Sequence, residues 1–385
     1  MKKIVFCFLG LLAVLYTASA QSYTFNHGPY LQELSEHAVT FVFTTSDKGF
    51  SWVEVKPDGG EAKRHYTVRN GLRDAYNTFN VIRVENLRPD TRYQYRLCSK
   101  QIADFQPYKV TFGDSIVSPW RRFSTPDPKA TACSFIALSD MHQQPDKLGR
   151  LLNQAGVGSA DMIFYVGDMM NYYDNKETPF RSFIDKSVEL FASEKPFVLV
   201  RGNHETRGNM AREYARYVPK SSGKYYGAYR VGDIMFVVLD CGEDKPDDFW
   251  VYAGLTDFDG YRTEQAAWFG KLIRSKAYKS AKWRIVMNHF PPLSHMEGDN
   301  PERHGIQDIT DKFLPLYNQA KIDLMISGHT HAYEFMSPDK YDRLTFPVIV
   351  NSTESVARID IDGRTLKAKV TDTGGNTLKE FTISK

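Results

Sequence analysis

SFIALSDMH, residues 134–142, joins a short apolar run to two side chains that can bind a metal ion, Asp140 and His142. The same arrangement recurs four times further along the chain. Each recurrence places an apolar run before a polar residue: 162–166 before Asp168, 197–200 before Asn203, 285–287 before His289, and 324–326 before His329 and His331. Such runs are typical of buried strands in an open α/β sheet, and ligands collect beyond the carboxyl ends of those strands. The pattern therefore predicts an α/β domain with one polar site.

Seven side chains in these segments are candidate metal ligands: Asp140, His142, Asp168, Asn203, His289, His329 and His331. Carboxylates and imidazoles suit divalent Mn, Fe or Zn, and seven ligands are too many for one ion. Any one of them alone would more often be an ordinary polar residue with a hydrogen-bond partner. Five such segments in a fixed order favour a shared site, and we expect two divalent metal ions to occupy it.

The five segments resemble the pattern of the calcineurin-like metallophosphoesterase superfamily, D-x-H, G-D, G-N-H-[DE], H and G-H-x-H. The resemblance covers residues 130–372 and leaves the substrate open. It implies a four-layered α/β/β/α sandwich with two metals that share Asp168 as a bridging ligand. The remaining ligands divide into two groups: Asp140, His142 and His331 for one metal, and Asn203, His289 and His329 for the other.

The implied chemistry is hydrolysis of a phosphoester. Two metals can lower the pKa of a bridging water and neutralise the charge that builds up during an in-line displacement. His204 follows the ligand Asn203, so we expect it to act as the general acid, with Glu205 orienting it. The alternative is that His204 only hydrogen-bonds the metal ligands. His295 and His304 lie in the loop after the fourth segment and are candidate substrate contacts.

The amino terminus has the features of an export signal. Lys2 and Lys3 precede an apolar stretch at 4–16, and Ala18-Ser19-Ala20 fits a cleavage site before Gln21. The stretch is shorter than the ~20 residues of a membrane-spanning helix. We therefore expect removal of residues 1–20 and a soluble protein, periplasmic or secreted, without a transmembrane segment.

Composition restricts the partners. Removal of Lys2 and Lys3 with the signal lowers the formal net charge from +3 to +1. This balance lacks the basic excess of nucleic-acid-binding proteins, so the expected partner is a small phosphorylated substrate. The oligomeric state is left open. Cys98, Cys133 and Cys241 are an odd set after cleavage, and we expect small buried side chains rather than a disulfide framework.

The first part of the chain lacks the metal motifs. At 385 residues the chain exceeds the usual size of one core. Residues 22–126 contain alternating or aromatic strands that predict an all-β sandwich: 38–43, 51–55, 80–84 and 91–97. The turn at 87–91 resembles fibronectin type III domains. The pairing of 28–32 with 123–126 is similar to the amino-terminal domain of purple acid phosphatases.

The second part alternates strands with helices. Residues 124–130, with two prolines, form the expected linker, and residues 373–385 are expected to be a final strand or tail. Helical spacing at 146–155 and 209–218 predicts helices, and Thr263 is expected to cap a third.

Purple acid phosphatases follow G-D with x-x-Y, whereas here Asn171 takes the tyrosine position and Tyr172 comes one place late. They also have a non-ligand where this chain has His142. The site therefore resembles the broader D-x-H phosphoesterases. The favoured function is an acid phosphatase-like phosphomonoesterase. The alternatives are a phosphodiesterase for nucleotides or lipid headgroups, and a non-catalytic metal-binding or adhesion protein.

Overall fold

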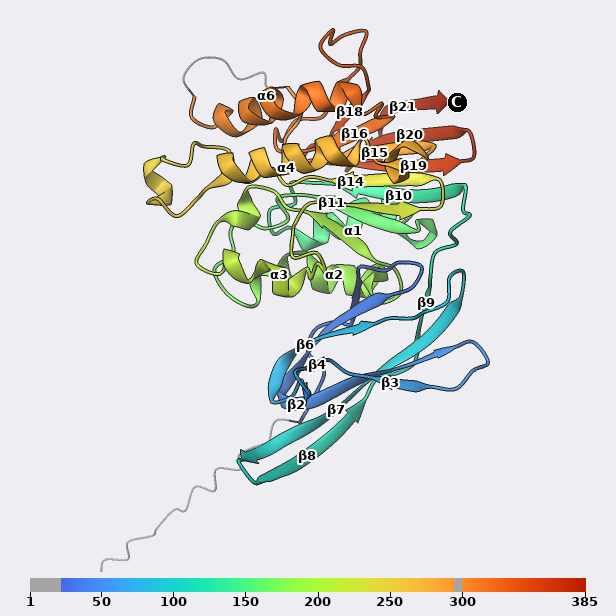
Figure 1. Cartoon of the computed structure of the whole chain (residues 1–385), viewed down its shortest axis with the longest axis vertical. Helices are drawn as coiled ribbons and strands as arrows, with labels where there is room; N and C mark the ends of the chain where they lie inside the picture. The colour runs from blue at the N-terminus through green and yellow to red at the C-terminus, as the bar shows by residue number, and fades with distance from the viewer. Residues whose placement is uncertain (1–21, 294–299) are drawn as a thin grey trace, which may run out of the picture.

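The structure is a computed structural model that describes residues 22–293 and 300–385. Figure 1 shows the early strands at one end of the molecule and the helices and remaining strands at the other. The predicted export signal at 1–20 lies outside the described residues. Across the two described ranges, none of the helices is long and apolar enough to cross a membrane.

The smaller, amino-terminal half of the molecule, residues 22–126, is all-β. A seven-stranded sheet contains β1 (Tyr30–Gln32), β2 (Val39–Pro57), β3 (Lys63–His65), β6 (Asn77–Val84), β7 (Arg92–Gln106), β8 (Lys109–Val117) and β9 (Arg121–Ser124). A separate hairpin consists of β4 (Val68–Arg69) and β5 (Leu72–Arg73). The all-β character of this half agrees with the prediction. Its resemblance to fibronectin type III domains stays a prediction.

The long strand β2 holds this half together. Its first part pairs with β1 and β6, and its second part pairs with β3 and β7. Phe41 and Phe43 from the first part share one core with Val53 and Val55 from the second. Side chains on a strand alternate between faces, so Val42 points the other way and packs in a different core with the carboxyl-terminal half.

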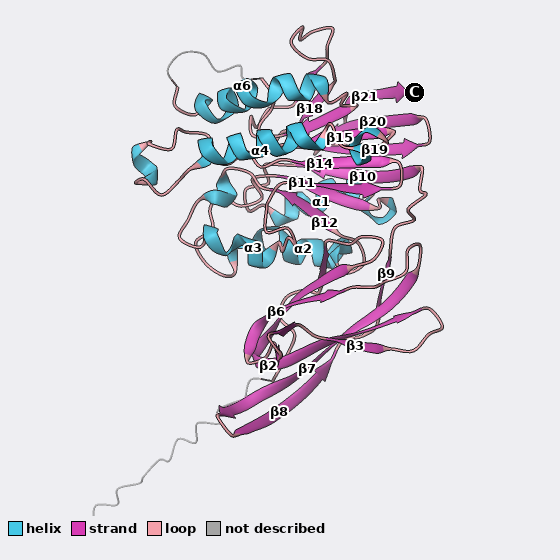
Figure 2. Cartoon of the chain, viewed as in Figure 1, coloured by secondary structure: helices cyan, strands magenta, loops and turns pink. Residues whose placement is uncertain are grey.

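The carboxyl-terminal half contains two six-stranded sheets (Figure 2). The first has the order β12 (Phe197–Val200), β11 (Met162–Val166), β10 (Ala132–Leu138), β19 (Ser355–Asp362), β20 (Thr365–Asp372) and β21 (Thr377–Ser384). The second has the order β13 (Gly227–Val231), β14 (Ile234–Val238), β15 (Trp283–Met287), β16 (Leu324–Ser327), β18 (Val348–Val350) and β17 (Glu334–Met336). The strands that precede the candidate ligands are parallel within each sheet.

Helices cover the outer faces of the sheets. The helices are α1 (Pro145–Gln154), α2 (Asp185–Ser187), α3 (Tyr214–Tyr217), α4 (Phe258–Leu272), α5 (Lys276–Lys279) and α6 (Arg303–Gln319). Shorter 3₁₀ and π segments are η1 (Val157–Ser159), η2 (Phe180–Ile184), η3 (Val188–Ala192), η4 (His204–Thr206), η5 (Ala211–Glu213) and η6 (Trp250–Tyr252).

Three cores separate the layers of this half. One core lies between the sheets, where Phe135 of β10 contacts Phe236 of β14. A second packs α1 and the 180–192 segment against the first sheet, and a third packs α4 and α6 against the second. The resulting helix, sheet, sheet and helix layers agree with the expected α/β/β/α arrangement. Cys98, Cys133 and Cys241 are free and buried, as expected.

Helix α4 begins at Phe258, so the prediction that Thr263 caps it is wrong. The carboxylate of Asp247 accepts hydrogen bonds from the backbone nitrogens of Phe258 and Asp259, at 2.8 and 2.9 Å. The Thr263 hydroxyl instead donates to the Asp259 carbonyl one turn back, at 2.9 Å. The start of this helix is therefore capped by a side chain distant in sequence, which a local cap pattern does not reveal.

The two halves share a packed interface. Tyr30, Val42 and Phe79 of the amino-terminal half belong to the same core as Phe197 and Tyr217 of the other half. The Tyr30 hydroxyl also donates to the carbonyl oxygen of Tyr217 at 2.7 Å. The amino-terminal half thus completes the outer wall of the α/β half.

His27 adds a charged contact to this interface. Its ring stacks on Phe180 with centroids 4.0 Å apart, Nδ1 lies 2.9 Å from Asp185, and Nε2 lies 3.0 Å from Glu177. The hydrogen bond to Asp185 raises the pKa of His27 above its ordinary 6.5. Folding therefore favours the imidazolium. This stabilisation is complete below the unfolded pKa of about 6.5 and disappears as the pH rises through the higher folded pKa.

We expect His27→Gln to lower the melting temperature by ~1–2 °C at pH 5.5, since partly exposed ion pairs contribute less than about 1 kcal/mol. The difference should shrink toward zero by pH 9. Thermal unfolding of both proteins across this pH range measures it. A difference that grows with pH would show that His27 acts here as a neutral ring.

Candidate metal centre

The predicted ligands meet at the carboxyl ends of strands from both sheets. Asp140 follows β10, Asp168 follows β11 and Asn203 follows β12 in the first sheet. His289 and His329 follow β15 and β16 in the second. Because parallel strands of one sheet end on the same side, their loops bring residues distant in sequence into one site.

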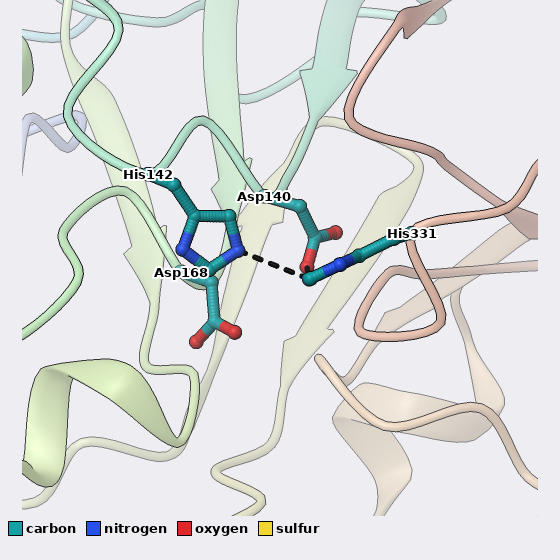
Figure 3. A group of neighbouring side chains, drawn as sticks. All are labelled: Asp140, His142, Asp168 and His331. Atoms are coloured by element: carbon teal, nitrogen blue, oxygen red, sulfur yellow. Dashed lines mark hydrogen bonds and ion pairs between the residues drawn. The ribbon is translucent and has the colours of Figure 1, made fainter.

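Four of these side chains point toward one another in Figure 3: Asp140, His142, Asp168 and His331. Their possible ligand atoms all lie within 4.8 Å of one another. Nε2 of His142 lies 3.0 Å from Nε2 of His331, which in turn lies 3.6 Å from an oxygen of Asp140. Asp168, His289 and His329 form a second group under the same limit. Asp168 is common to both groups.

Among the described residues, three buried atoms that could bind a metal have no hydrogen-bond partner while the His289 ring is neutral: Oδ2 of Asp168, Oδ1 of Asn203 and Nε2 of His289. Buried polar atoms in proteins are nearly always paired, so three such atoms at one place require an explanation. The donor set of carboxylate, amide oxygen and imidazole suits a divalent cation. The residues present therefore fit a metal ion.

The surroundings of His289 strengthen this argument. Its Nδ1 lies 2.7 Å from the Val166 carbonyl oxygen and donates to it, so Nε2 of the neutral ring carries a lone pair. That lone pair is directed at Oδ2 of Asp168, only 3.1 Å away. A proton can join them, because Asp168 raises the pKa of His289 to about 10 although burial alone would lower it. A metal ion would displace that proton and serve both atoms.

Burial also sets the charge of the other candidate ligands. It lowers the pKa of His142 to about 4 and that of His329 to about 3, so both rings are neutral near pH 7. Neutral imidazole is the form that binds metals. Burial raises the pKa of Asp140 to about 7, and the Ser139 hydroxyl donates to its carboxylate at 2.5 Å. A nearby cation would favour the charged carboxylate.

Five of the seven candidate ligands adopt positive φ angles: Asp140 (57°), His142 (46°), Asp168 (55°), His329 (73°) and His331 (59°). A residue with a Cβ in this region costs roughly 1–2 kcal/mol. Hydrogen bonds within the site offset this strain. The backbone nitrogen of His142 donates to the Asp168 carbonyl at 3.0 Å, and that of His329 donates to the Asp140 carboxylate at 3.0 Å. The strain is concentrated where the ligands converge.

His204 borders this site without belonging to either ligand group. Its Nδ1 lies 2.6 Å from the Asn171 carbonyl oxygen, and its Nε2 lies 3.9 Å from Oδ2 of Asp168. The side chain is 24% exposed, so a substrate can reach it. Donation from Nδ1 to the carbonyl would fix the ring and leave Nε2 facing the site.

The expectation that Glu205 orients His204 is wrong. The buried carboxylate of Glu205 accepts hydrogen bonds from the backbone nitrogens of Asp168, Met169, Met170 and Gly202, at 2.8, 2.8, 3.2 and 2.9 Å. Glu205 therefore fixes the loop that carries Asp168. A Cβ on Gly202 would lie only 2.2 Å from Oδ1 of Asp168, so this close approach requires glycine.

Asn171 takes the orienting role through two of its atoms. Its carbonyl oxygen receives His204, and its side-chain oxygen lies 3.1 Å from Nδ1 of His142. This second contact directs the opposite nitrogen of His142 into the ligand group. Asn171 stands at the position of the tyrosine in the purple acid phosphatase motif. It therefore holds His142, the candidate ligand that this motif lacks.

Sequence reasoning missed Arg207, Glu243 and Asp244. Asn203 donates from its side-chain nitrogen to Asp244 at 3.4 Å, and Arg207 forms ion pairs with both acids. Glu243 and Asp244 follow β14, as the predicted ligands follow their own strands. That position after an apolar run is the signal that would have identified them.

Of the two predicted substrate contacts, the structure describes only His304. Nε2 of His304 lies 2.8 Å from Asp259, at the contact between α6 and α4. Its role in substrate binding stays a prediction. His295 lies outside the described residues.

Comparison with known proteins connects this geometry to a family. The model of the calcineurin-like phosphoesterases matches residues 133–333. Purple acid phosphatase 21 of Arabidopsis thaliana is 23% identical over 277 residues, which are 68% of this chain and 55% of that protein. Purple acid phosphatase 1 of Ipomoea batatas is 23% identical over 264 residues, 65% of this chain and 50% of that protein. The chain thus spans about half the length of these curated relatives.

Two solved structures share the fold over most of the chain. A purple acid phosphatase from yellow lupin seeds aligns with a TM-score of 0.66 and 15% identity, covering 92% of this chain and 74% of that one. PhoD aligns with a TM-score of 0.62 and 13% identity, covering 92% of this chain and 89% of that one.

Proposed function

Because the chain belongs to the calcineurin-like phosphoesterase family, we propose that it is a metal-dependent phosphoric ester hydrolase that acts on phosphomonoesters. The observation that carries the proposal is the set of three buried atoms on Asp168, Asn203 and His289 that lack a hydrogen-bond partner among the described residues while His289 is neutral. We propose two divalent ions, of Mn, Fe or Zn, held by the seven ligands with Asp168 between them. Such ions would supply an activated water and Lewis-acid polarisation of the phosphoryl group.

The chain's own residues supply binding geometry and a proton. His204 is proposed to protonate the leaving alkoxide from Nε2, while Nδ1 stays bonded to the Asn171 carbonyl. Glu205 keeps the Asp168 loop rigid, so the shared ligand does not shift during the reaction. The signal-like residues 1–20 support export to the periplasm or medium, which we propose as the site of action.

Purified protein reconstituted with Mn(II), Zn(II) or Fe(II) tests the function. We expect at least one metal to give hydrolysis of nitrophenyl phosphate, a lower rate with bis-nitrophenyl phosphate, and loss of both activities on chelation. The metal requirement follows from the ligand set, because ions held there would lower the pKa of a bound water toward ~7 and so supply the nucleophile. A preference for the diester would favour the phosphodiesterase alternative. Bound metal without hydrolysis of either ester would favour a binding protein.

A further inference from the structure

Arg207 lies beside His204 at the border of the candidate metal centre. It directly follows the 3₁₀ helix η4, which begins at His204. Side chains three residues apart are eclipsed along a 3₁₀ helix, so His204 and Arg207 project to the same side. Nη1 of Arg207 lies 3.0 Å from Nε2 of His204. The guanidinium therefore reaches the nitrogen that we assign to proton transfer.

Two buried acids hold this guanidinium in one orientation. Nε and Nη2 of Arg207 donate to the two carboxylate oxygens of Glu243 at 2.8 and 2.9 Å, and Nη2 lies 3.2 Å from Asp244. The Glu243 and Asp244 side chains are only 2% and 6% exposed, whereas Arg207 is 29% exposed. Bidentate pairing of this kind fixes a planar fork. Among the described residues, no carboxylate accepts a hydrogen bond from Nη1.

The position of the acids explains why a cation is needed here. Asp244 accepts a hydrogen bond from the candidate ligand Asn203, so the acidic pair is adjacent to the site. An incoming phosphate ester is an anion and would be repelled by these carboxylates in a partly buried setting. Arg207 bridges the acidic pair and His204, and so presents a donor where the acids would otherwise face the substrate.

We propose that Arg207 binds a non-bridging phosphoryl oxygen of the substrate through Nη1, and thereby favours monoesters over diesters. The inference rests on the proposed function. A monoester offers three non-bridging oxygens and up to two negative charges near neutral pH, whereas a diester offers two oxygens and one charge. A fixed charged donor therefore adds more to monoester binding. Transfer of the Nη1 hydrogen bond to phosphate also frees the lone pair on Nε2 of His204, which can then take up a proton from water and pass it to the leaving group.

Calorimetric titration of the metal-loaded protein with inorganic phosphate tests the contact without relying on turnover. Arg207→Met should weaken phosphate binding by about 10- to 100-fold, as expected for loss of a hydrogen bond to a charged group. Its metal content should equal that of wild type. Lys245→Met is the matched control, because Lys245 also pairs with Asp244, at 2.9 Å, but has no contact with His204. It should bind phosphate as wild type does.

The double variant Arg207→Met/Glu243→Gln removes the charge of the buried acid that loses its cation in the single variant. It therefore distinguishes direct contact of Arg207 with phosphate from simple neutralisation of Glu243. If Arg207 touches phosphate, the double variant stays as weak as Arg207→Met. Wild-type affinity in either variant would overturn the proposal.

Selectivity gives a second readout. The ratio of kcat/KM for nitrophenyl phosphate over bis-nitrophenyl phosphate should fall in Arg207→Met, and an unchanged ratio would refute the selective role. A wild-type protein that neither binds phosphate nor hydrolyses either ester would overturn the proposed function and this inference together. Normal wild-type behaviour with an unaffected Arg207→Met would overturn the inference alone.

Discussion

Asp168→Asn should abolish turnover and remove metal from both ligand groups, while the fold persists. Asp168 is common to the two groups, and its buried Oδ2 lies 3.1 Å from Nε2 of His289. Asparagine keeps the size of the side chain but loses the charge that both cations need. The loss of metal affinity should exceed ~10- to 100-fold, the usual effect of removing a hydrogen-bonding partner of a metal ligand.

The fold should survive because the Asp168 loop is held by other groups. Glu205 binds the backbone nitrogen of Asp168 at 2.8 Å, and the flanking strand β11 is fully buried. Metal analysis beside circular dichroism measures both expectations. Asp161→Asn is the matched control, since Asp161 is exposed and precedes the same strand; it should keep its metals and activity. An Asp168→Asn protein with two metals and full activity would remove Asp168 from the centre of the site.

His204→Ala should slow esters with high-pKa leaving groups by ~10²- to 10⁴-fold, the range of a positioned proton donor. Nitrophenyl esters should be affected less, because their leaving group departs as a fairly stable anion. Both metals should stay bound, since His204 belongs to neither ligand group.

The measurement is the dependence of kcat/KM on leaving-group pKa at fixed metal load, for wild type and variant. A steeper dependence in the variant supports proton donation from His204. His37→Ala serves as a control for loss of a histidine, because the His37 side chain is 64% exposed in the amino-terminal half. Parallel dependences, or metal loss in His204→Ala, would assign His204 to supporting the ligands.

The strands could be predicted because each leaves a local pattern in the sequence, and the convergence of the ligands follows from the topology of parallel sheets. A buried strand leaves a run of apolar residues in the sequence, and the topology of parallel sheets brings the residues after such runs together. This reasoning placed Asp140 and Asp168 in one group. It treated 38–43 and 51–55 as separate strands, however, whereas β2 continues through an irregularity in pairing between Thr44 and Gly49. An irregularity of this kind resembles a turn in sequence.

The network around the ligands could not be predicted, because it depends on contacts between distant loops. Glu205 was assigned to its neighbour His204, but its carboxylate is satisfied by the backbone of a loop more than 30 residues earlier. Arg207 has no local pattern that reveals its pairing with Glu243, which lies 36 residues away. Tertiary approach decides such contacts, and a single sequence does not record it.

The shared core between the halves has a consequence for how the protein can change over generations. Tyr30 and Phe79 pack against the wall of the α/β half, where they cover Phe197 and Tyr217. A recombination event at residues 124–130 that passed on only one half would expose this aromatic surface to water. Exposed apolar patches of this kind promote aggregation. We therefore expect the two halves to be inherited together. A substitution on one side of this shared core should limit which substitutions the other side can accept.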